Sequence, residues 1–172
     1  MLKFSKKTDY AIILLAHLAA VDLPVSAQEI ADVYELPQPM MANILKQLCV
    51  AGLVQSMRGQ SGGYVLAKTP EEITLTDIII VTDNLFTMVE CAHDEEVCKV
   101  HRYCPTREPL VTLHKKIQRF MEETTLASIM TEALIKHPLT QETLDENPHL
   151  SRLQRYHAHG SKGGGSDASL FH

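Results

Sequence analysis

Three of the four cysteines of this chain lie close together, at Cys91, Cys98 and Cys104. They have the spacing C-x6-C-x5-C, and the surrounding residues carry mixed charges with little apolar periodicity, which predicts a loop. Clustered thiols in a loop point to a metal site, to a redox-sensitive thiol switch, or to chance. Structural zinc sites use closely spaced C-x2–4-C pairs, which this stretch lacks. The spacing favours metal binding and leaves the kind of metal centre open.

Three thiolates leave a tetrahedral zinc ion, or an iron–sulfur cluster, one protein ligand short. The fourth ligand can come from His93, His101 or His114, from a carboxylate, or from another subunit. Cys49, the remaining cysteine, falls in the apolar pattern of a predicted helix. A small buried hydrophobic residue explains Cys49 better than a metal ligand does.

The composition predicts one domain with a core of its own, because the chain has 172 residues of which 45% are hydrophobic. No apolar run approaches the roughly 20 residues that span a bilayer, so we expect no membrane partner. The basic-then-apolar start is weakly similar to a signal peptide, but Asp9 and His17 interrupt it. We therefore expect a folded first helix in the cytoplasm, where clustered thiols stay reduced.

The net charge of −5 argues against a protein that coats nucleic acid non-specifically. Residues 1–70 are nearly neutral, with six cations against five anions, so the acidity lies further along the chain. Any binding of phosphates must therefore come from individually placed cations.

Three helices are predicted in the first 52 residues. The first is an apolar stripe over residues 6–21. Ser26 followed by Glu29 is a capping box that starts a short second helix. Pro39 suits the first turn of a third helix, and Gly52 suits its C-terminal cap.

Two short strands follow, over residues 53–57 and 64–67, with "RGQSGG" as the turn between them. Three helices and then a glycine-tipped hairpin is the order of a winged helix-turn-helix domain. The predicted fold class is thus mainly α with a small β-hairpin wing. A small helical bundle with an incidental hairpin is the alternative.

The second half of the chain is expected to be helical around the cysteine loop. A helix capped by Thr74 or Thr76 precedes the loop. One long amphipathic helix over residues 106–130 follows the loop. We expect a partner subunit to cover its apolar face. Packing of this face against the three-helix head of the same chain is the alternative. That face consists of Leu110, Leu113, Ile117, Phe120 and Met121.

Several of these stretches together resemble a known family. "KKTDYAIILLAHLA", "RGQSGGYVLA", "ITLTDIIIVTD", the three-cysteine spacing and "TLASIM" are similar to the bacterial winged-helix iron–sulfur regulators that include IscR, NsrR and RirA. The resemblance covers about residues 1–131 and is closest to regulators of SUF-type iron–sulfur assembly genes. It implies a homodimeric transcription regulator in four parts. These are a DNA-binding domain (1–82), a cluster-binding loop (83–105), a dimerisation helix (106–132) and a flexible tail (133–172).

The resemblance also implies the cluster ligands Cys91, Cys98 and Cys104. The histidine that completes the 2Fe–2S site of IscR is replaced here by Arg107, which has no lone pair to offer a metal. NsrR-type members use an aspartate from the first helix of the partner subunit, and this chain has Asp9 at that position. We therefore expect a 4Fe–4S cluster with Asp9 as fourth ligand, and a 2Fe–2S cluster as the alternative. Otherwise, Asp9 merely favours the positive end of its helix.

In such a domain the third helix enters the major groove of double-stranded DNA, the wing reaches the minor groove, and a dimer reads a pseudo-palindromic operator. Arg58 is the strongest single contact, because the wing motif of the family carries it. The predicted DNA-binding residues are Gln38, Met40, Asn43, Lys46 (or Gln47), Arg58, Gln60, Ser61 and Lys6.

Other functions remain open at this point. The same fold tuned to nitric oxide is one. A zinc-stabilised interaction module or a small electron carrier is another, and it predicts no DNA affinity. No nucleophile–base pair and no phosphate-binding loop are present, so the sequence predicts that the protein is not an enzyme.

Overall fold

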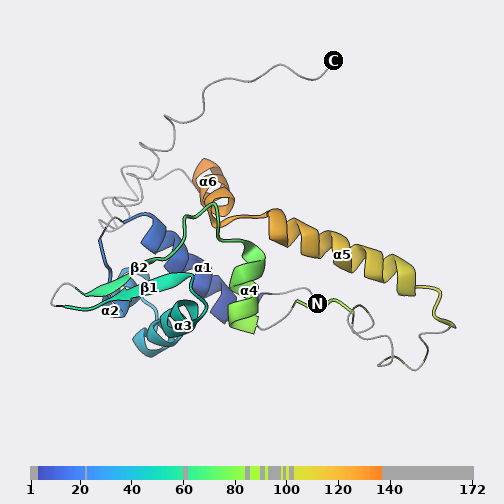
Figure 1. The fold of residues 1–172 in the computed structure, drawn as a ribbon, viewed down its shortest axis with the longest axis horizontal. Coiled ribbons are helices and arrows are strands. Elements are labelled where there is room, and N and C mark those ends of the chain that lie inside the picture. The colour runs from blue at the N-terminus through green and yellow to red at the C-terminus, as the bar shows by residue number, and fades with distance from the viewer. Residues whose placement is uncertain are drawn as a thin grey trace, which may run out of the picture.

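The computed structural model of the chain describes residues 4–21, 23–59, 62–83, 86–89, 92, 98, 100 and 103–136. Its described part is a helical head with a two-stranded hairpin, from which one helix extends away (Figure 1). The elements are α1 (Lys6–Ala19), α2 (Ala27–Tyr34), α3 (Gln38–Val50), β1 (Val54–Met57), β2 (Gly63–Leu66), α4 (Leu75–Asp83), α5 (Arg107–Glu123) and α6 (Leu126–Lys136).

The core of the head forms where α1 crosses the other helices. Leu14 and Leu15 of α1 are completely buried, as are Ile30 of α2 and Leu45 of α3. The predicted capping box at the start of α2 is confirmed, because the Ser26 hydroxyl accepts from the Glu29 amide at 3.1 Å and the Glu29 carboxylate accepts from the Ser26 amide at 3.0 Å. Local capping and apolar spacing together account for these three helices.

The predicted ends of α3 are also confirmed. Pro39 lies in the first turn, where its missing N–H leaves no helical bond unmade. At the other end the Leu53 amide donates to the Leu48 carbonyl at 3.0 Å, and Gly52 has a φ of +73°. This is the six-to-one hydrogen bond of a glycine-terminated helix, and it turns the chain directly into β1.

The hairpin is an integral part of the head. Its strands pair antiparallel, from Val54 opposite Leu66 to Met57 opposite Gly63. Tyr64 also exchanges two backbone hydrogen bonds with Val25, of 3.1 and 2.8 Å, between α1 and α2. A Cβ atom on Gly63 would lie 2.7 Å from the Val25 backbone, so only glycine permits this approach. The fold is therefore the predicted winged helix-turn-helix, and the alternative of an incidental hairpin is wrong.

Helix α4 packs on α1 and α3 and starts at Thr74. The Thr74 hydroxyl accepts from the Asp77 amide at 3.1 Å, and the Asp77 carboxylate accepts from the Thr74 amide at 2.9 Å. Of the two predicted caps, Thr74 is therefore the one used.

The single long helix predicted for residues 106–130 is wrong, because α5 ends at Glu123 and α6 begins at Leu126. Thr124 is extended, with φ −85° and ψ 110°, and Thr125 caps α6 through a 3.2 Å bond from the Ser128 amide. Backbone hydrogen bonds of 2.8 Å join Leu75 to Thr124 and Leu126 to Ile73. This pairing with the start of α4 stabilises the break and directs α6 back onto the head.

Helix α6 then buries Leu126 and Met130 in the core of the head and continues to Lys136. The expected tail therefore starts no earlier than residue 137, and residues 137–172 lie outside the described part of the chain. A second apolar cluster fixes the near end of α5 to α4 through Met121, Leu75 and Ile79. No described helix combines the length and hydropathy needed to cross a membrane.

The capping box of α2 provides a direct test of the helix-turn-helix packing. Ser26→Ala is expected to lower the free energy of unfolding by about 1 kcal/mol, because it removes the acceptor for the Glu29 amide. Chemical denaturation measures this change. Ser56→Ala on exposed β1 is the matched control, with an expected change below about 0.5 kcal/mol. Equal effects of the two substitutions would contradict the capping role.

Candidate nucleic-acid interface and metal centre

The predicted DNA-reading residues of α3 lie on its exposed side. Met41, Ile44, Leu45 and Leu48 form the buried side of the helix. Met40, Asn43 and Lys46 are exposed, and Gln38 at the start of the helix is half-buried. The 3.6-residue period that buries one side of α3 therefore presents amide, thioether and ammonium groups on the other.

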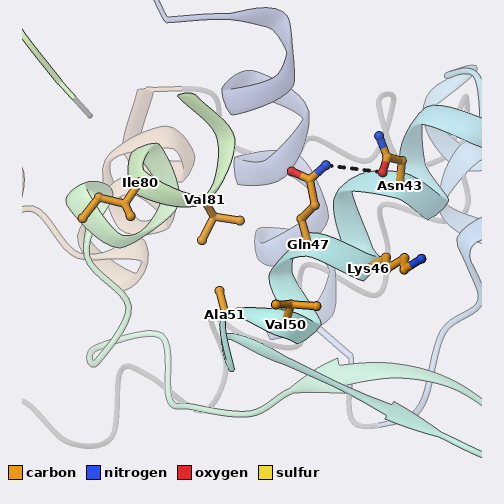
Figure 2. Close-up of a pocket in the computed structure, with 7 residues that line it drawn as sticks. All are labelled: Asn43, Lys46, Gln47, Val50, Ala51, Ile80 and Val81. Atoms are coloured by element: carbon orange, nitrogen blue, oxygen red, sulfur yellow. Dashed lines mark hydrogen bonds between the residues drawn. The ribbon is translucent and has the colours of Figure 1, made fainter. Parts of the chain in front are cut away.

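Asn43 and Gln47 are one helical turn apart, and the Gln47 side-chain amide donates to the Asn43 side-chain carbonyl at 3.3 Å (Figure 2). The bond orients both side chains and leaves the Asn43 amide and the Gln47 carbonyl oxygen for other partners. Asparagine and glutamine are the side chains that read adenine by paired hydrogen bonds.

The wing carries Arg58 directly after β1, where it is exposed and followed by Gly59 with a φ of +130°. Gln60 and Ser61, the other predicted wing contacts, lie outside the described residues. At the start of α1, Lys6 is exposed, whereas the Lys7 ammonium donates to the Thr82 carbonyl at 2.9 Å. Of these two lysines, Lys6 is the one whose charge faces solvent.

A hollow of about 460 Å³ lies between α3 and α4, beside the same face (Figure 2). Val50 and Ile80 contribute its exposed apolar surface, with 85% and 50% of their surface accessible. The sequence does not predict this hollow, because it depends on how α3 and α4 pack together although 24 residues separate them in the chain. The hollow is lined by Asn43, Lys46, Gln47, Val50, Ala51, Ile80 and Val81.

Cys104 lies just before α5, where the positive end of the helix faces its thiol. The Thr106 hydroxyl is 3.3 Å from the Cys104 sulfur. Hydrogen bonds from the Thr106 hydroxyl and backbone, with further contributions from the Arg107 backbone and charge, lower the pKa of the Cys104 thiol. The position thus favours the thiolate, which is the form that binds metal.

The remaining predicted ligands are not gathered within the described part of one chain. Cys98 is half-buried, Asp9 is exposed in the first turn of α1, and Cys91 lies outside the described residues. Among the residues described, no three cysteine, histidine or acidic side chains are grouped closely enough to hold an ion. The donor set nevertheless fits an iron–sulfur cluster chemically, because it supplies soft sulfur ligands and the surroundings of Cys104 lower the pKa of its thiol.

Of the three alternative histidine ligands, the structure describes His114. The His114 ring on α5 is only 3% exposed and stacks on Phe86, with ring centroids 5.6 Å apart. His114 is thus part of the packing between the loop's start and α5. His93 and His101 lie outside the described residues.

One polar cluster beside Asp9 was not predicted. The Thr8 hydroxyl donates to the Asp83 carboxylate at 2.8 Å and lies 2.7 Å from the Thr82 hydroxyl. The Ser5 amide lies 3.4 Å from the same carboxylate. Ser5, Lys7 and Thr8 thus fasten the start of α1 to Thr82 and Asp83 at the end of α4, and we call these five residues the α1–α4 junction.

Comparison with known proteins agrees with this architecture. The Rrf2 family model, described as "Iron-dependent Transcriptional regulator", matches residues 4–132. CymR of Bacillus subtilis is 32% identical over 74% of this chain and 89% of its own length, and NsrR of Halalkalibacterium halodurans is 28% identical over 78% and 98%.

Two solved structures are similar over most of their length. The structure of CymR, titled the global cysteine regulator of B. subtilis, has a TM-score of 0.62 and 33% identity and covers 75% of this chain and 96% of its own. T. potens IscR has a TM-score of 0.62 and 28% identity and covers 82% and 95%. The described fold, the exposed face of α3 and these matches agree: the chain belongs to the Rrf2 family of winged-helix transcription regulators.

Proposed function

We propose that this DNA-binding transcription regulator is a homodimer that senses iron–sulfur status through a bound cluster and controls SUF-type iron–sulfur assembly genes. As a member of a regulator family, it is not an enzyme. The observation that carries the proposal is the position of Cys104, where the start of α5 stabilises a thiolate within the C-x6-C-x5-C spacing. The description of the Rrf2 family as iron-dependent regulators supports it.

The residues that would hold the cluster are Cys91, Cys98, Cys104 and Asp9 of the partner subunit. When bound, the cluster supplies an iron centre that is sensitive to iron supply, oxidants and nitric oxide. A 4Fe–4S cluster suits the Asp9 carboxylate, and a 2Fe–2S cluster is the alternative. Asp9 is exposed and one residue from the α1–α4 junction, so it is accessible to a second chain.

The DNA-binding surface of each subunit combines α3 with the wing. Asn43 and Gln47 present amides toward base edges in the major groove, and Met40 offers an apolar contact for a thymine methyl group. Arg58 reaches the minor groove, while Lys6 and Lys46 neutralise phosphates, with Gln60 and Ser61 as further wing contacts. Two such surfaces in a dimer read a pseudo-palindromic operator.

Anaerobic purification followed by absorption and Mössbauer spectroscopy tests the proposal, together with DNA binding of the loaded and cluster-free forms. A 4Fe–4S spectrum and a change in DNA affinity on cluster loss are expected. Colourless protein that binds DNA identically with and without added iron and sulfide would contradict cluster sensing. In that case a regulator without a cluster becomes the better description of the chain.

Arg58→Ala tests the wing. The substitution is expected to weaken operator binding about tenfold and to lower the salt dependence of binding by about one ion, because a wing cation is lost. Titrations at several salt concentrations measure both effects. Lys68→Ala is the matched control, since it removes an exposed cation beyond the other end of β2. A loss as large in Lys68→Ala would show that bulk charge, not the wing, binds DNA.

A further inference from the structure

The α1–α4 junction joins two helix ends of opposite polarity. The Asp83 carboxylate accepts from the Thr8 hydroxyl at 2.8 Å at the start of α1, where backbone amides point outward. The Lys7 ammonium donates to the Thr82 carbonyl at 2.9 Å, at the end of α4, where carbonyls lack helical partners. An anion at an N-terminus and a cation at a C-terminus both stabilise helix dipoles. Each helix therefore neutralises the end of the other.

The centre of the junction is shielded from water. Thr8 is 0% exposed and Thr82 is 7% exposed, and their hydroxyl oxygens are 2.7 Å apart. The Thr82 hydroxyl also lies 2.9 Å from the Ile78 carbonyl within α4. A buried hydroxyl that loses its partner is costly, so the hydrogen bonds fix how the two helix ends lie against each other. Apolar packing alone would tolerate sliding between them more readily.

The junction separates the two parts that a sensor must connect. Asp9 directly follows Thr8 in α1, but it faces solvent, whereas Thr8 faces α4. Asp83 is the last residue of α4 and directly precedes the loop that contains the three cysteines. Further along α1, Leu14 and Leu15 lie in the core that supports α2 and α3. The junction therefore connects the residue that precedes the loop directly to the helix that supports the DNA-binding head.

We propose that Thr8 and Asp83 are positioning residues that hold the Asp9-bearing turn of α1 against α4 and thereby couple the cysteine loop to the DNA-binding head. The inference rests on the proposed function and adds residues that bind neither DNA nor the cluster. Allosteric coupling requires an element with two arrangements, and in this proposal the hydrogen-bonded junction of the structure is one of them and a released junction is the other. The hydrogen-bonded junction accompanies one conformation of the cysteine loop, and the released junction accompanies the other.

Thr8→Val removes the hydroxyl but keeps the shape of the side chain, and Thr8→Ser restores the hydroxyl. Thr76→Val is the matched control, because Thr76 lies on α4, outside the junction, and its buried hydroxyl has no hydrogen-bond partner within the described residues. Asp83→Asn tests the carboxylate separately and serves if Thr8→Val does not fold. For each protein the measurements are Tm, iron content and spectrum, and operator affinity with and without the cluster.

We compare the operator affinity of the cluster-loaded protein with that of the cluster-free protein. This ratio is expected to be tenfold or more in the wild type and below about threefold in Thr8→Val. Iron content and the affinity of the cluster-free form should stay within about twofold, and Thr8→Ser and Thr76→Val should keep the wild-type ratio. A merely structural role would lower Tm and both affinities together without changing their ratio. An unchanged ratio in Thr8→Val, or in Asp83→Asn if that alone folds, would overturn the inference. A wild-type protein whose operator affinity is the same with and without the cluster would instead contradict the proposed function.

Hydrogen exchange of the cluster-free protein gives a readout that needs no iron. Thr8→Val is expected to speed exchange of the backbone amides in the last turn of α4 and the first turn of α1 by about tenfold, because the bonds that hold these turns are lost. Amides in the middle of α3 should be unaffected. Equal exchange in both proteins would overturn the claim that the junction holds these turns together.

Discussion

Cys104→Ala, purified without oxygen, is expected to retain less than about a tenth of the wild-type iron and to lose the sulfur-to-iron absorption bands. The effect is expected to be large because the surroundings of Cys104 favour the thiolate, which is the form that binds metal. Hydrogen bonds from Thr106, helped by Arg107, favour its ionised form. Cysteine binds metal as the thiolate, so this substitution removes a ligand whose surroundings favour the metal-binding form.

The fourth cysteine of the chain provides the control for this experiment. Cys49→Ala changes the same functional group on α3, where burial raises the pKa of the thiol and disfavours the thiolate. It should keep the wild-type iron content and spectrum. If Cys104→Ala retained its iron, or if both variants lost it equally, the assignment of the cluster to the cysteine loop would be wrong.

Local signals in the sequence were sufficient to predict the head. The ends of α2 and α3 depend on hydrogen bonds between residues three to five positions apart, such as Ser26 with Glu29 and Leu48 with Leu53. Both partners of each contact lie within one short motif, so the motif alone is enough to predict these contacts. The wing followed from its glycines, although its pairing with Val25 did not.

The break between α5 and α6 shows where local reasoning fails. Apolar periodicity continues past Thr124, so it predicted one helix. The Thr125–Ser128 pair was a readable capping signal, but a threonine within a helix is also common. The break is stabilised by pairing with Ile73 and Leu75, about 50 residues earlier in the chain. Only the tertiary structure determines whether such a signal is used.

The candidate site also has parts that the sequence predicts and parts that only the tertiary structure reveals. The cysteines and the exposed side of α3 were predicted from residue type and spacing. The α1–α4 junction was not, because the Thr8 hydroxyl and the Asp83 carboxylate are 75 positions apart in the sequence. The different roles of Lys6 and Lys7 were also missed, since adjacent lysines look alike until one of them meets the end of α4.

Phe120→Glu is expected to convert the proposed dimer to a monomer and to weaken binding to a palindromic operator at least about 100-fold, because the second half-site is then no longer held in place. Leu110, Leu113, Ile117 and Phe120 recur at intervals of three and four residues along α5, which is the spacing of paired helices. Phe120 is 66% exposed and Leu113 is 43% exposed in the single chain. Figure 1 shows α5 extending away from the head, and although Ile117 packs partly against the apolar cluster on α4, Leu113 and Phe120 stay exposed.

Gln118→Glu is the matched control, because it adds the same carboxylate to exposed α5 on the side opposite Phe120. Sedimentation analysis gives the oligomeric state, and binding to full and half operators separates avidity from contact. Phe120→Glu should bind a half operator as the wild type does, since α3 and the wing are untouched, while it loses the preference for the full operator. A monomeric wild type, or a Phe120→Glu variant that remains dimeric, would show that the exposed face of α5 has another use. In that case the partner-supplied Asp9 ligand would also have to be abandoned, because it needs a second chain.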